Sequence, residues 1–197
     1  MKYITLVLLL FASSTINTNY AQVGKKPENT IRFFPSLPVF SDNWYSRHLK
    51  VMNEPALWQN TKGDVIRFLW LRTFDNPVSV KIEKRGNKII LSWIITGGKG
   101  GYEPEKIITN KSKSLSLQQW NDCIALLNNA GYWDMSTIKE EKYEVIDIVL
   151  DGDQWILEAN INKKYHIVDR PDGDSIRNLC LYFLNLTDIF IHKEKIY

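Results

Sequence analysis

Cysteine is scarce in this chain of 197 residues, which contains only Cys123 and Cys180. Two cysteines are too few for a fold that depends on a disulfide framework, and their separation excludes a CxxC motif. Both lie in segments that we expect to be helical. Either the two helices pack side by side and the cysteines pair, which requires Cα atoms within about 7 Å, or both remain small buried thiols. The pair Cys123 and Cys180 is therefore a possible disulfide.

Runs of like charge are also absent. The chain has 25 Lys and Arg against 22 Asp and Glu, for a formal net charge of +3, and the two signs are interspersed. No basic stretch can follow a phosphate backbone, which argues against a nucleic-acid partner. Hydrophobic residues make up 44% of the sequence, which favours a packed domain over disorder.

The one pronounced apolar run lies at the N-terminus. Ile4–Ala12 follows the basic Lys2 and precedes a small polar stretch that ends in Ala21. The run is too short to span a bilayer, which takes roughly 20 residues, and has the arrangement of a secretory signal. We expect residues 1–21 to be a cleaved signal peptide and the protein to be secreted or periplasmic. Asn19 is larger than the residue preferred before a cleavage site, so the exact site stays open.

Metal-binding spacings are missing as well. His48, His166 and His192 are far apart and form neither an HxxxH nor an HxH pattern. The acidic residues around the last strands lack the glycine and the final glutamate of an EF-hand loop. These residues are Asp147, Asp151, Asp153, Asp172 and Asp174. We expect neither a metal nor a cofactor.

A lysine among glycines in Gly97–Gly101 suggests a phosphate-binding loop, but the context is wrong. Such a loop needs Gly-Lys followed by Ser or Thr and then a helix. Lys99 is followed by Gly-Gly-Tyr, which is typical of a flexible turn.

The pattern of apolar residues divides the mature chain into two parts. Residues 22–60 have no steady period and are interrupted by prolines, so we expect an extended N-terminal lead-in, with a short helix within 43–59 as the alternative. Residues 61–197 are expected to form a single α+β domain, which is a suitable size for one core.

Three strands are predicted at the start of this domain. Val65–Phe74 is apolar on both faces apart from Arg67 and Arg72, and two alternating segments follow at 78–83 and 89–95. Short turns between them predict an antiparallel meander.

A helix over Ser116–Ala130 is the clearest element, because Ser116 and Gln119 form a capping box and Gly131 supplies a helix stop. A strand at 145–150, a β-hairpin over 151–170 and a last helix from about Asp174 complete the pattern. The sequence thus predicts an α+β fold in which two helices cover one face of an antiparallel sheet of about six strands, in the order βββ-α-βββ-α.

The hairpin carries the polar residues of most interest. If 161–163 form a three-residue loop, Glu158 lies opposite His166, and Trp155 lies on the other, core-facing side. A Glu opposite a His either orients the imidazole for acid–base catalysis or forms an ordinary cross-strand pair. A slip of one residue in the register would separate them.

Four further charged residues complete the candidate polar site. Asp169 and Arg170 end the second hairpin strand, where they either bind a ligand or hold the following turn. Arg67 and Arg72 interrupt the first strand. The candidate polar site thus comprises Glu158, His166, Arg170, Asp169, Arg67 and Arg72.

Aromatic residues are plentiful, with seven Trp and nine Tyr, and could provide a surface for stacking sugars or peptides. Trp93, Trp120 and Trp155 have the spacing of core residues. Trp44 and Trp58 lie outside the clear elements and are the better candidates for exposed aromatics.

Several motifs together resemble an uncharacterised family of bacterial exported proteins, over roughly residues 53–188. The resemblance implies export but no activity, ligand or catalytic residue. In that family a Trp follows the Asp-Arg pair, whereas Pro171 follows it here. The motifs are Asn53–Leu57, Arg67–Phe74, Gly100–Tyr102, Asp151–Glu158 without Asp153, and Tyr165–Arg170 without Ile167.

These observations lead to three hypotheses. The first is a non-enzymatic domain that binds a protein, a peptide or another component of the cell envelope, which predicts an exposed apolar patch or groove. The second is a hydrolase that uses Glu158, His166 and Asp169, which requires these groups to converge in a cleft. The third is a purely structural envelope protein with neither feature.

Overall fold

A computed structural model describes residues 32–59, 62–139 and 152–190 of the chain. All of these residues belong to one compact unit, which extends from Ile31 to the C-terminus. The expected signal peptide and the expected strand at 145–150 lie outside the described residues.

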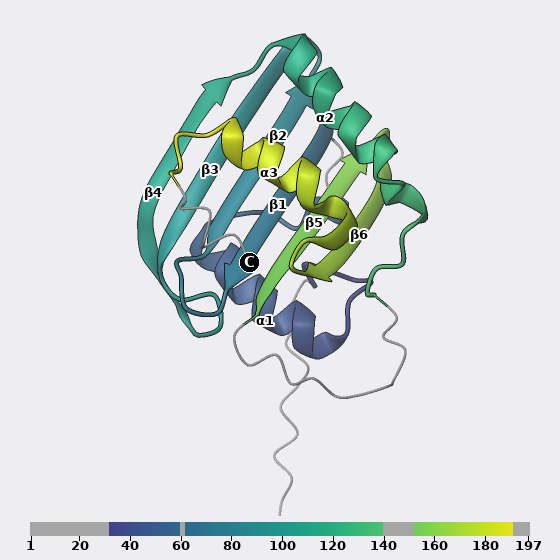
Figure 1. Cartoon of the computed structure of the whole chain (residues 1–197). Helices are drawn as coiled ribbons and strands as arrows, with labels where there is room; N and C mark the ends of the chain where they lie inside the picture. The colour runs from purple at the N-terminus through teal and green to yellow at the C-terminus, as the bar shows by residue number, and fades with distance from the viewer. Residues whose placement is uncertain (1–31, 60–61, 140–151, 191–197) are drawn as a thin grey trace, which may run out of the picture. The chain divides into compact units, whose positions relative to one another are not determined.

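The described residues form one antiparallel sheet of six strands in the order β4-β3-β2-β1-β5-β6. Every neighbouring pair is antiparallel. Figure 1 shows the sheet with β1 in its middle, where it joins the β1–β4 meander to the β5–β6 hairpin. The strands are β1 (Asp64–Arg72), β2 (Val78–Arg85), β3 (Lys88–Gly98), β4 (Pro104–Ser114), β5 (Asp153–Ile161) and β6 (Lys164–Pro171).

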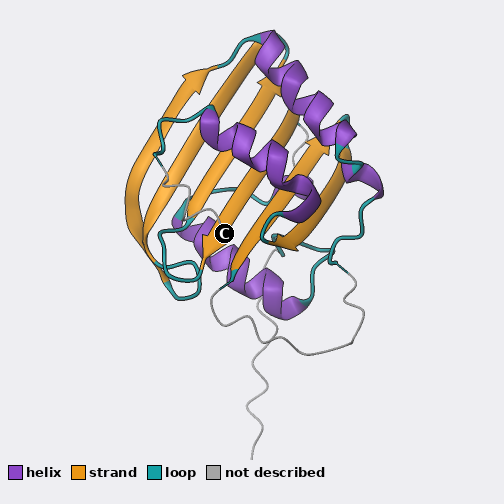
Figure 2. Cartoon of the chain, in the orientation of Figure 1, coloured by secondary structure: helices purple, strands orange, loops and turns teal. Residues whose placement is uncertain are grey.

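Three α-helices accompany the sheet, with helices on both of its faces (Figure 2). They are α1 (Val39–Val51), α2 (Leu117–Asn129) and α3 (Arg177–Asn185). Short 3-10 helices lie at η1 (Leu57–Gln59), η2 (Tyr132–Asp134) and η3 (Asp174–Ile176). No helix among the described residues is long and apolar enough to cross a membrane.

Helices α2 and α3 cover one face of the sheet, as predicted. The predicted capping box is present: the Gln119 amide donates to Ser116 Oγ at 3.1 Å, and the Ser116 amide donates to Gln119 Oε1 at 2.9 Å. Gly131 follows with a φ of 67°. The core beneath these helices contains a cluster of aromatic rings, in which the centre of the Trp155 ring lies 5.1 Å from the ring centres of both Phe68 and Trp70.

Cys123 and Cys180 both lie in this core as free thiols, so no disulfide joins them in the structure. Burial raises the pKa of the Cys123 thiol to about 12 and holds the pKa of Cys180 well above its ordinary value. Of the two alternatives left open by the sequence, the structure has the buried thiols.

The opposite face of the sheet has a core of its own beneath α1, which lies within the segment expected to be an extended lead-in. This helix begins after Pro38 and buries Tyr45 and Leu49 against strand residues such as Leu69 and Ile156. The alternative of a short helix within 43–59 is thus closer to the structure than the extended lead-in, although α1 begins four residues earlier, at Val39, and adds a layer on the face opposite to the two predicted helices.

A fourth strand, β4, follows β3 and was not predicted. It lies at the edge of the sheet and most of its side chains are exposed. Lysines at 106, 111 and 113 are typical of an edge strand that resists pairing with other chains. The described elements after α1 thus run ββββ-α-ββ-α, in which β4 is additional to the expected order βββ-α-βββ-α and the expected strand at 145–150 lies outside the described residues.

The hairpin between β5 and β6 has a two-residue turn, because Asn162 and Lys163 both have positive φ angles of 51° and 65°. Turns of this kind match the twist of the two strands. The pairing sets Glu158 opposite Ile167 and Ala159 opposite His166. The three-residue loop assumed from the sequence is therefore wrong, and the strand register differs from the predicted one by one residue.

Gly100 fixes the β3–β4 connection against the end of β1. Its amide lies 2.9 Å from the carbonyl oxygen of Arg72 and 3.0 Å from that of Asp75. A Cβ atom at Gly100 would lie 2.6 Å from the backbone nitrogen and oxygen of Arg72, closer than atoms approach without displacement. The connection therefore requires glycine at this position.

We predict that Gly100→Ala lowers the free energy of unfolding by about 1–3 kcal/mol, because the backbone of β1 cannot move aside. Gly101→Ala is the matched comparison, since its Cβ would lie 3.1 Å from a methyl carbon of Thr73 and 3.2 Å from the backbone oxygen of Thr73, contacts that are relieved by a much smaller shift than at Gly100. Urea denaturation of both variants measures the difference. Equal losses in the two variants would contradict the prediction.

Candidate functional site

Arg67 and Glu158 form a buried ion pair across β1 and β5. They are directly opposite each other in the sheet, and neither residue is exposed. Arg67 donates from Nε to Glu158 Oε2 at 2.8 Å and also from Nη2 to the same oxygen. The other carboxylate oxygen, Glu158 Oε1, accepts a hydrogen bond from the Tyr165 hydroxyl at 2.8 Å.

Two more charges extend this pair across the sheet. Arg67 Nη1 lies 3.3 Å from Glu54 Oε2, and Lys81 of β2 donates to the same oxygen at 2.8 Å. Arg67 Nη1 also donates to the carbonyl oxygen of Pro55 at 2.8 Å. Burial acts to lower the pKa of Arg67, but the charges of Glu158 and Glu54 outweigh it and raise the pKa. The arginine thus stays charged, while burial raises the pKa of Glu158 against the opposing effect of Arg67.

The structure does not bring Glu158 and His166 together. Their offset of one residue places them on opposite faces of the sheet. His166 lies within hydrogen-bond distance of the Met135 carbonyl oxygen, at 3.0 Å, and packs edge-on against Tyr132. Burial lowers the pKa of His166. The convergence required for the hydrolase hypothesis is therefore absent from this hairpin.

Asp169 and Arg170 serve the packing of β6. Tyr45 of α1 donates to Asp169 Oδ2 at 2.8 Å. On the other face, Arg170 donates from Nη1 to the carbonyl oxygen of Thr137 at 3.2 Å and from Nη2 to that of Ser136 at 2.7 Å. The two neighbouring charges therefore fasten different segments to the two faces of the same strand.

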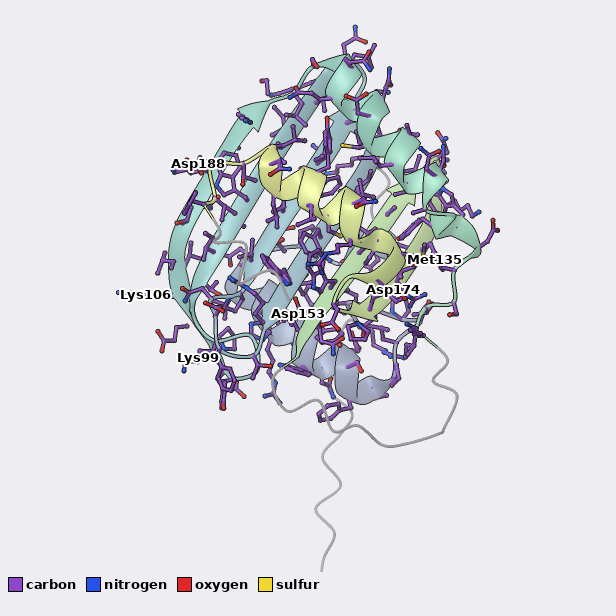
Figure 3. The ribbon with its side chains drawn as sticks, viewed as in Figure 1. Lys99, Lys106, Met135, Asp153, Asp174 and Asp188 are labelled. Atoms are coloured by element: carbon purple, nitrogen blue, oxygen red, sulfur yellow. The ribbon has the colours of Figure 1, made fainter. Side chains whose placement is uncertain are left out.

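Arg72 lies beside a second buried carboxylate that the sequence did not single out. Its guanidinium carbon is 4.2 Å from the centre of the Trp70 ring. The indole nitrogens of Trp70, at 2.7 Å, and of Trp155 both donate to Asp153 Oδ2. The carboxylate is 1% exposed, and burial raises its pKa. Asp153 is labelled in Figure 3 near the start of β5.

Of the predicted polar residues, only Arg67 and Glu158 contact each other through their side chains, and the other four are held at separate positions by partners of their own. Within the described part of the chain, no group of three or more His, Cys, Asp and Glu side chains is placed to hold a metal ion. The surface groove described next is formed by other residues.

An open groove lies between α1 and the β3–β4 loop. Its first pocket has a volume of about 450 Å³ and is bounded by residues of both segments. A second pocket of about 430 Å³ adjoins it and reaches the end of β1 and the start of β5. Trp44, Gly101 and Tyr102 line both pockets. We call the two pockets together the aromatic groove.

The α1 side of the aromatic groove follows from the helical repeat. Phe40, Asn43, Trp44 and Arg47 are spaced so that they share one side of the helix. Phe40 is 76% exposed, although it is a large apolar residue. The rings of Phe40 and Trp44 are 6.4 Å apart. This side of α1 therefore presents aromatic surface to solvent.

The facing wall comes from the β3–β4 loop, whose Lys99 is labelled at the same end of the sheet as Asp153 in Figure 3. Tyr102 is 58% exposed, and its amide donates to the carbonyl oxygen of Lys99 at 2.9 Å. Glu103 forms an ion pair with Arg47 of α1 across the first pocket. The groove thus combines exposed rings with a charged pair at its rim.

The floor of the second pocket is built by strand ends that already have their backbone partners. Leu71 of β1 lies opposite Gln154 of β5 in the sheet. Thr73 donates through Oγ1 to the Gly152 carbonyl oxygen at 2.6 Å. The loop above is fixed by the Gly101 amide, which donates to the carbonyl oxygen of Thr73 at 3.3 Å.

His48 lies behind the aromatic groove on the inner side of α1, with no exposed surface. Burial lowers its pKa to about 4, so the imidazole is neutral at neutral pH. Its ring nitrogens make no hydrogen bond within the described residues. The side chain acts as a packing residue between α1 and the glycine loop.

The sequence pointed to only part of this groove. Trp44 was expected to be an exposed aromatic and lines both pockets, whereas Trp58, 39% exposed, lies outside it. The spacing of Phe40, Asn43, Trp44 and Arg47 was the available signal, but it is readable only if a helix is assumed there. No family model, curated protein or solved structure matches the chain.

We predict that Glu158→Gln lowers the free energy of unfolding by about 3–5 kcal/mol, because it leaves an uncompensated positive charge in the buried cluster. Asp174→Asn is the control: Asp174 pairs with Lys139 at 3.0 Å on an exposed surface, where such pairs contribute about 1 kcal/mol or less. Chemical denaturation gives both values. A loss in Glu158→Gln no larger than in the control would show that the cluster does not depend on this pair.

A further prediction concerns Asp169. Burial raises the pKa of this carboxyl group from 3.8 to about 6, against the opposing effects of Tyr45 and Arg170. The folded protein then binds the proton more tightly than the unfolded chain, so the free energy of unfolding falls as pH rises from about 4 to about 6. We expect wild type to lose about 2–3 kcal/mol relative to Asp169→Asn across this window. Denaturation of both proteins at several pH values tests this. A difference that stays constant with pH would disprove the assignment.

Proposed function

We propose that this chain is an exported, non-enzymatic domain that binds a component of the bacterial cell envelope through the aromatic groove. The observation that carries the proposal is the grouping of exposed rings, Phe40 and Tyr102, with the half-buried Trp44 around two adjoining pockets. Large exposed aromatic side chains are costly to leave in water, and such groups mark binding surfaces.

The shape of the groove supports the same conclusion. Its two pockets have volumes within the range of ligand-binding sites, and a few polar groups stand among the rings. The loop that forms one wall is fixed by backbone hydrogen bonds from Gly100 and Gly101. A groove that is already formed binds its ligand without the cost of ordering a mobile segment.

The proposed location of the protein in the cell envelope is inferred from its N-terminal sequence. The basic residue, the short apolar run and the small residues of positions 2–21 have the arrangement of an export signal. An exported protein meets the components of the envelope first, which makes them the candidate ligands.

A catalytic role has less support. Glu158 is fully buried and bonded to Arg67 and Tyr165, and His166 lies on the other face of the sheet. Asp169 is bonded to Tyr45. The residues of the hydrolase hypothesis therefore do not share a cleft, and no observation favours a second function.

Co-sedimentation with purified bacterial envelopes tests the proposal. We expect Trp44→Ala and Tyr102→Ala to weaken binding by about thirtyfold, the loss of a central aromatic anchor. Trp58→Ala and Phe190→Ala are matched controls, because both residues are exposed aromatics that do not line the groove. Melting curves confirm that each variant is folded.

Two results would refute the proposal. One is the absence of binding by the wild-type chain to any envelope fraction. The other is binding that falls equally in the groove variants and the controls, which would indicate non-specific adhesion through any exposed ring.

A further inference from the structure

The chemical character of the aromatic groove limits the class of ligand that it can bind. Resting on the function proposed above, we propose that the groove binds a glycan chain of low net charge, with sugar rings stacked on Trp44 and Tyr102. A sugar ring presents an apolar face of C–H groups and an edge of hydroxyl groups. The aromatic rings of the groove match the apolar face of a sugar, and the polar side chains of the groove match its hydroxyl groups.

The polar groups argue against a purely apolar partner. Asn43, Arg47 and Glu103 lie between and beside the exposed rings of the first pocket. An apolar helix laid over these rings would remove an amide, a guanidinium and a carboxylate from water without replacing their hydrogen bonds, at a cost for each. Hydroxyl groups both donate and accept, so a sugar can satisfy all three types.

The charges of the lining indicate how much charge the ligand carries. Arg47 and Glu103 are the charged residues among those that line the two pockets, and they pair with each other. Their charges cancel, so the groove offers no excess positive charge to a phosphorylated or strongly acidic polymer. A neutral or nearly neutral ligand fits this balance.

The dimensions indicate a chain of sugars. Trp44 and Tyr102 line both pockets, so they stand where the two meet. The first pocket then receives one sugar beside Arg47, and the second receives the next beside Thr73 and Gln154. Two adjoining compartments with aromatic surface between them suit a linear ligand that passes from one to the other.

An extended peptide is less well served by the same surface. Peptides commonly bind by adding a strand to the free edge of a sheet. The strand residues of the groove, Leu71 and Gln154, belong to β1 and β5, each of which already pairs with a strand on both sides. The edge strands of the sheet are β4 and β6, and part of β6 is bridged by Ile138. The groove therefore has no unpaired strand to offer a peptide backbone.

The test uses the full mature chain and two materials. One is envelope polysaccharide that has been stripped of protein with protease and of lipid with detergent, for co-sedimentation. The other is a soluble tetramer of β-1,4-linked N-acetylglucosamine, as competitor and as titrant followed by tryptophan fluorescence. We expect the stripped polysaccharide to retain the chain and the tetramer to release it.

Variants connect the binding to the groove. We expect Tyr102→Ala to weaken binding of both materials by about thirtyfold and Tyr102→Phe to keep most of it, because the ring provides the stacking surface. Trp44→Ala should behave like Tyr102→Ala. The control Trp58→Ala should leave binding unchanged. Tyr102 is the decisive position, since its side chain is mostly exposed and its loss leaves the core intact.

The outcomes separate this inference from the broader function. If protease treatment abolishes sedimentation while the groove variants still fail on untreated envelopes, the ligand is a protein or peptide, and the glycan assignment is overturned although the binding function stands. Binding of stripped polysaccharide that is indifferent to Tyr102→Ala also overturns it. If untreated envelopes do not bind, both the function and the inference fail.

Discussion

The pairing of β1 with β5 is the constraint on which the rest of the structure depends. These two strands join a four-stranded meander to a two-stranded hairpin, so their register sets the position of every other strand. The register is fixed from both faces. Arg67 opposes Glu158 on one face, and Trp70 opposes Trp155 on the other. A shift of one residue would bury unpaired charges in one core and leave the ring cluster of the other incomplete.

The same pairing positions the aromatic groove. Because Leu71 and Gln154 are held opposite each other, the end of β1 and the start of β5 meet at one end of the sheet, where Thr73 bonds to Gly152. The Gly100 connection is then held against Arg72, which places Tyr102 opposite α1. Buried interactions that no ligand can reach thus determine the shape of a surface that a ligand can reach.

Much of the fold could be predicted from the sequence, because its strongest local signals agree with the tertiary structure. The first three strands alternate or run apolar, and Ser116 with Gln119 marks the start of α2. Helix α1 was left only as an alternative, within 43–59, because the side it buries includes polar residues, Asp42 and His48, which hide the apolar period. Strand β4 was missed because an exposed edge strand carries lysines in place of alternating apolar residues.

The candidate site was harder to predict, for reasons that are physical. The hairpin register depends on two adjacent residues with positive φ, and the second is Lys163, a residue that gives no signal for this conformation. The one-residue difference separated Glu158 from His166 and paired Glu158 with Arg67, which lies 91 positions earlier in the chain. Partners so distant cannot be read from local spacing. Trp44 was expected to be exposed and is half-buried, and its neighbours in space, Tyr102 and Glu103, come from another segment.

Helix α1 shows how structure and function are divided between two sides of one element. Its inner side places Tyr45, His48 and Leu49 against the sheet, where Tyr45 also bonds to Asp169. Its outer side places Phe40 and Trp44 in the groove. Trp44 also packs against the core beneath the helix, with its ring 5.5 Å from that of Tyr45, whereas Phe40, Asn43 and Arg47 are exposed, so changes at these three positions leave the helix anchored by its inner side. A difference in ligand preference can therefore arise at Phe40, Asn43 or Arg47 without loss of stability, whereas the Arg67 cluster permits no such variation, since each of its charges is balanced by another.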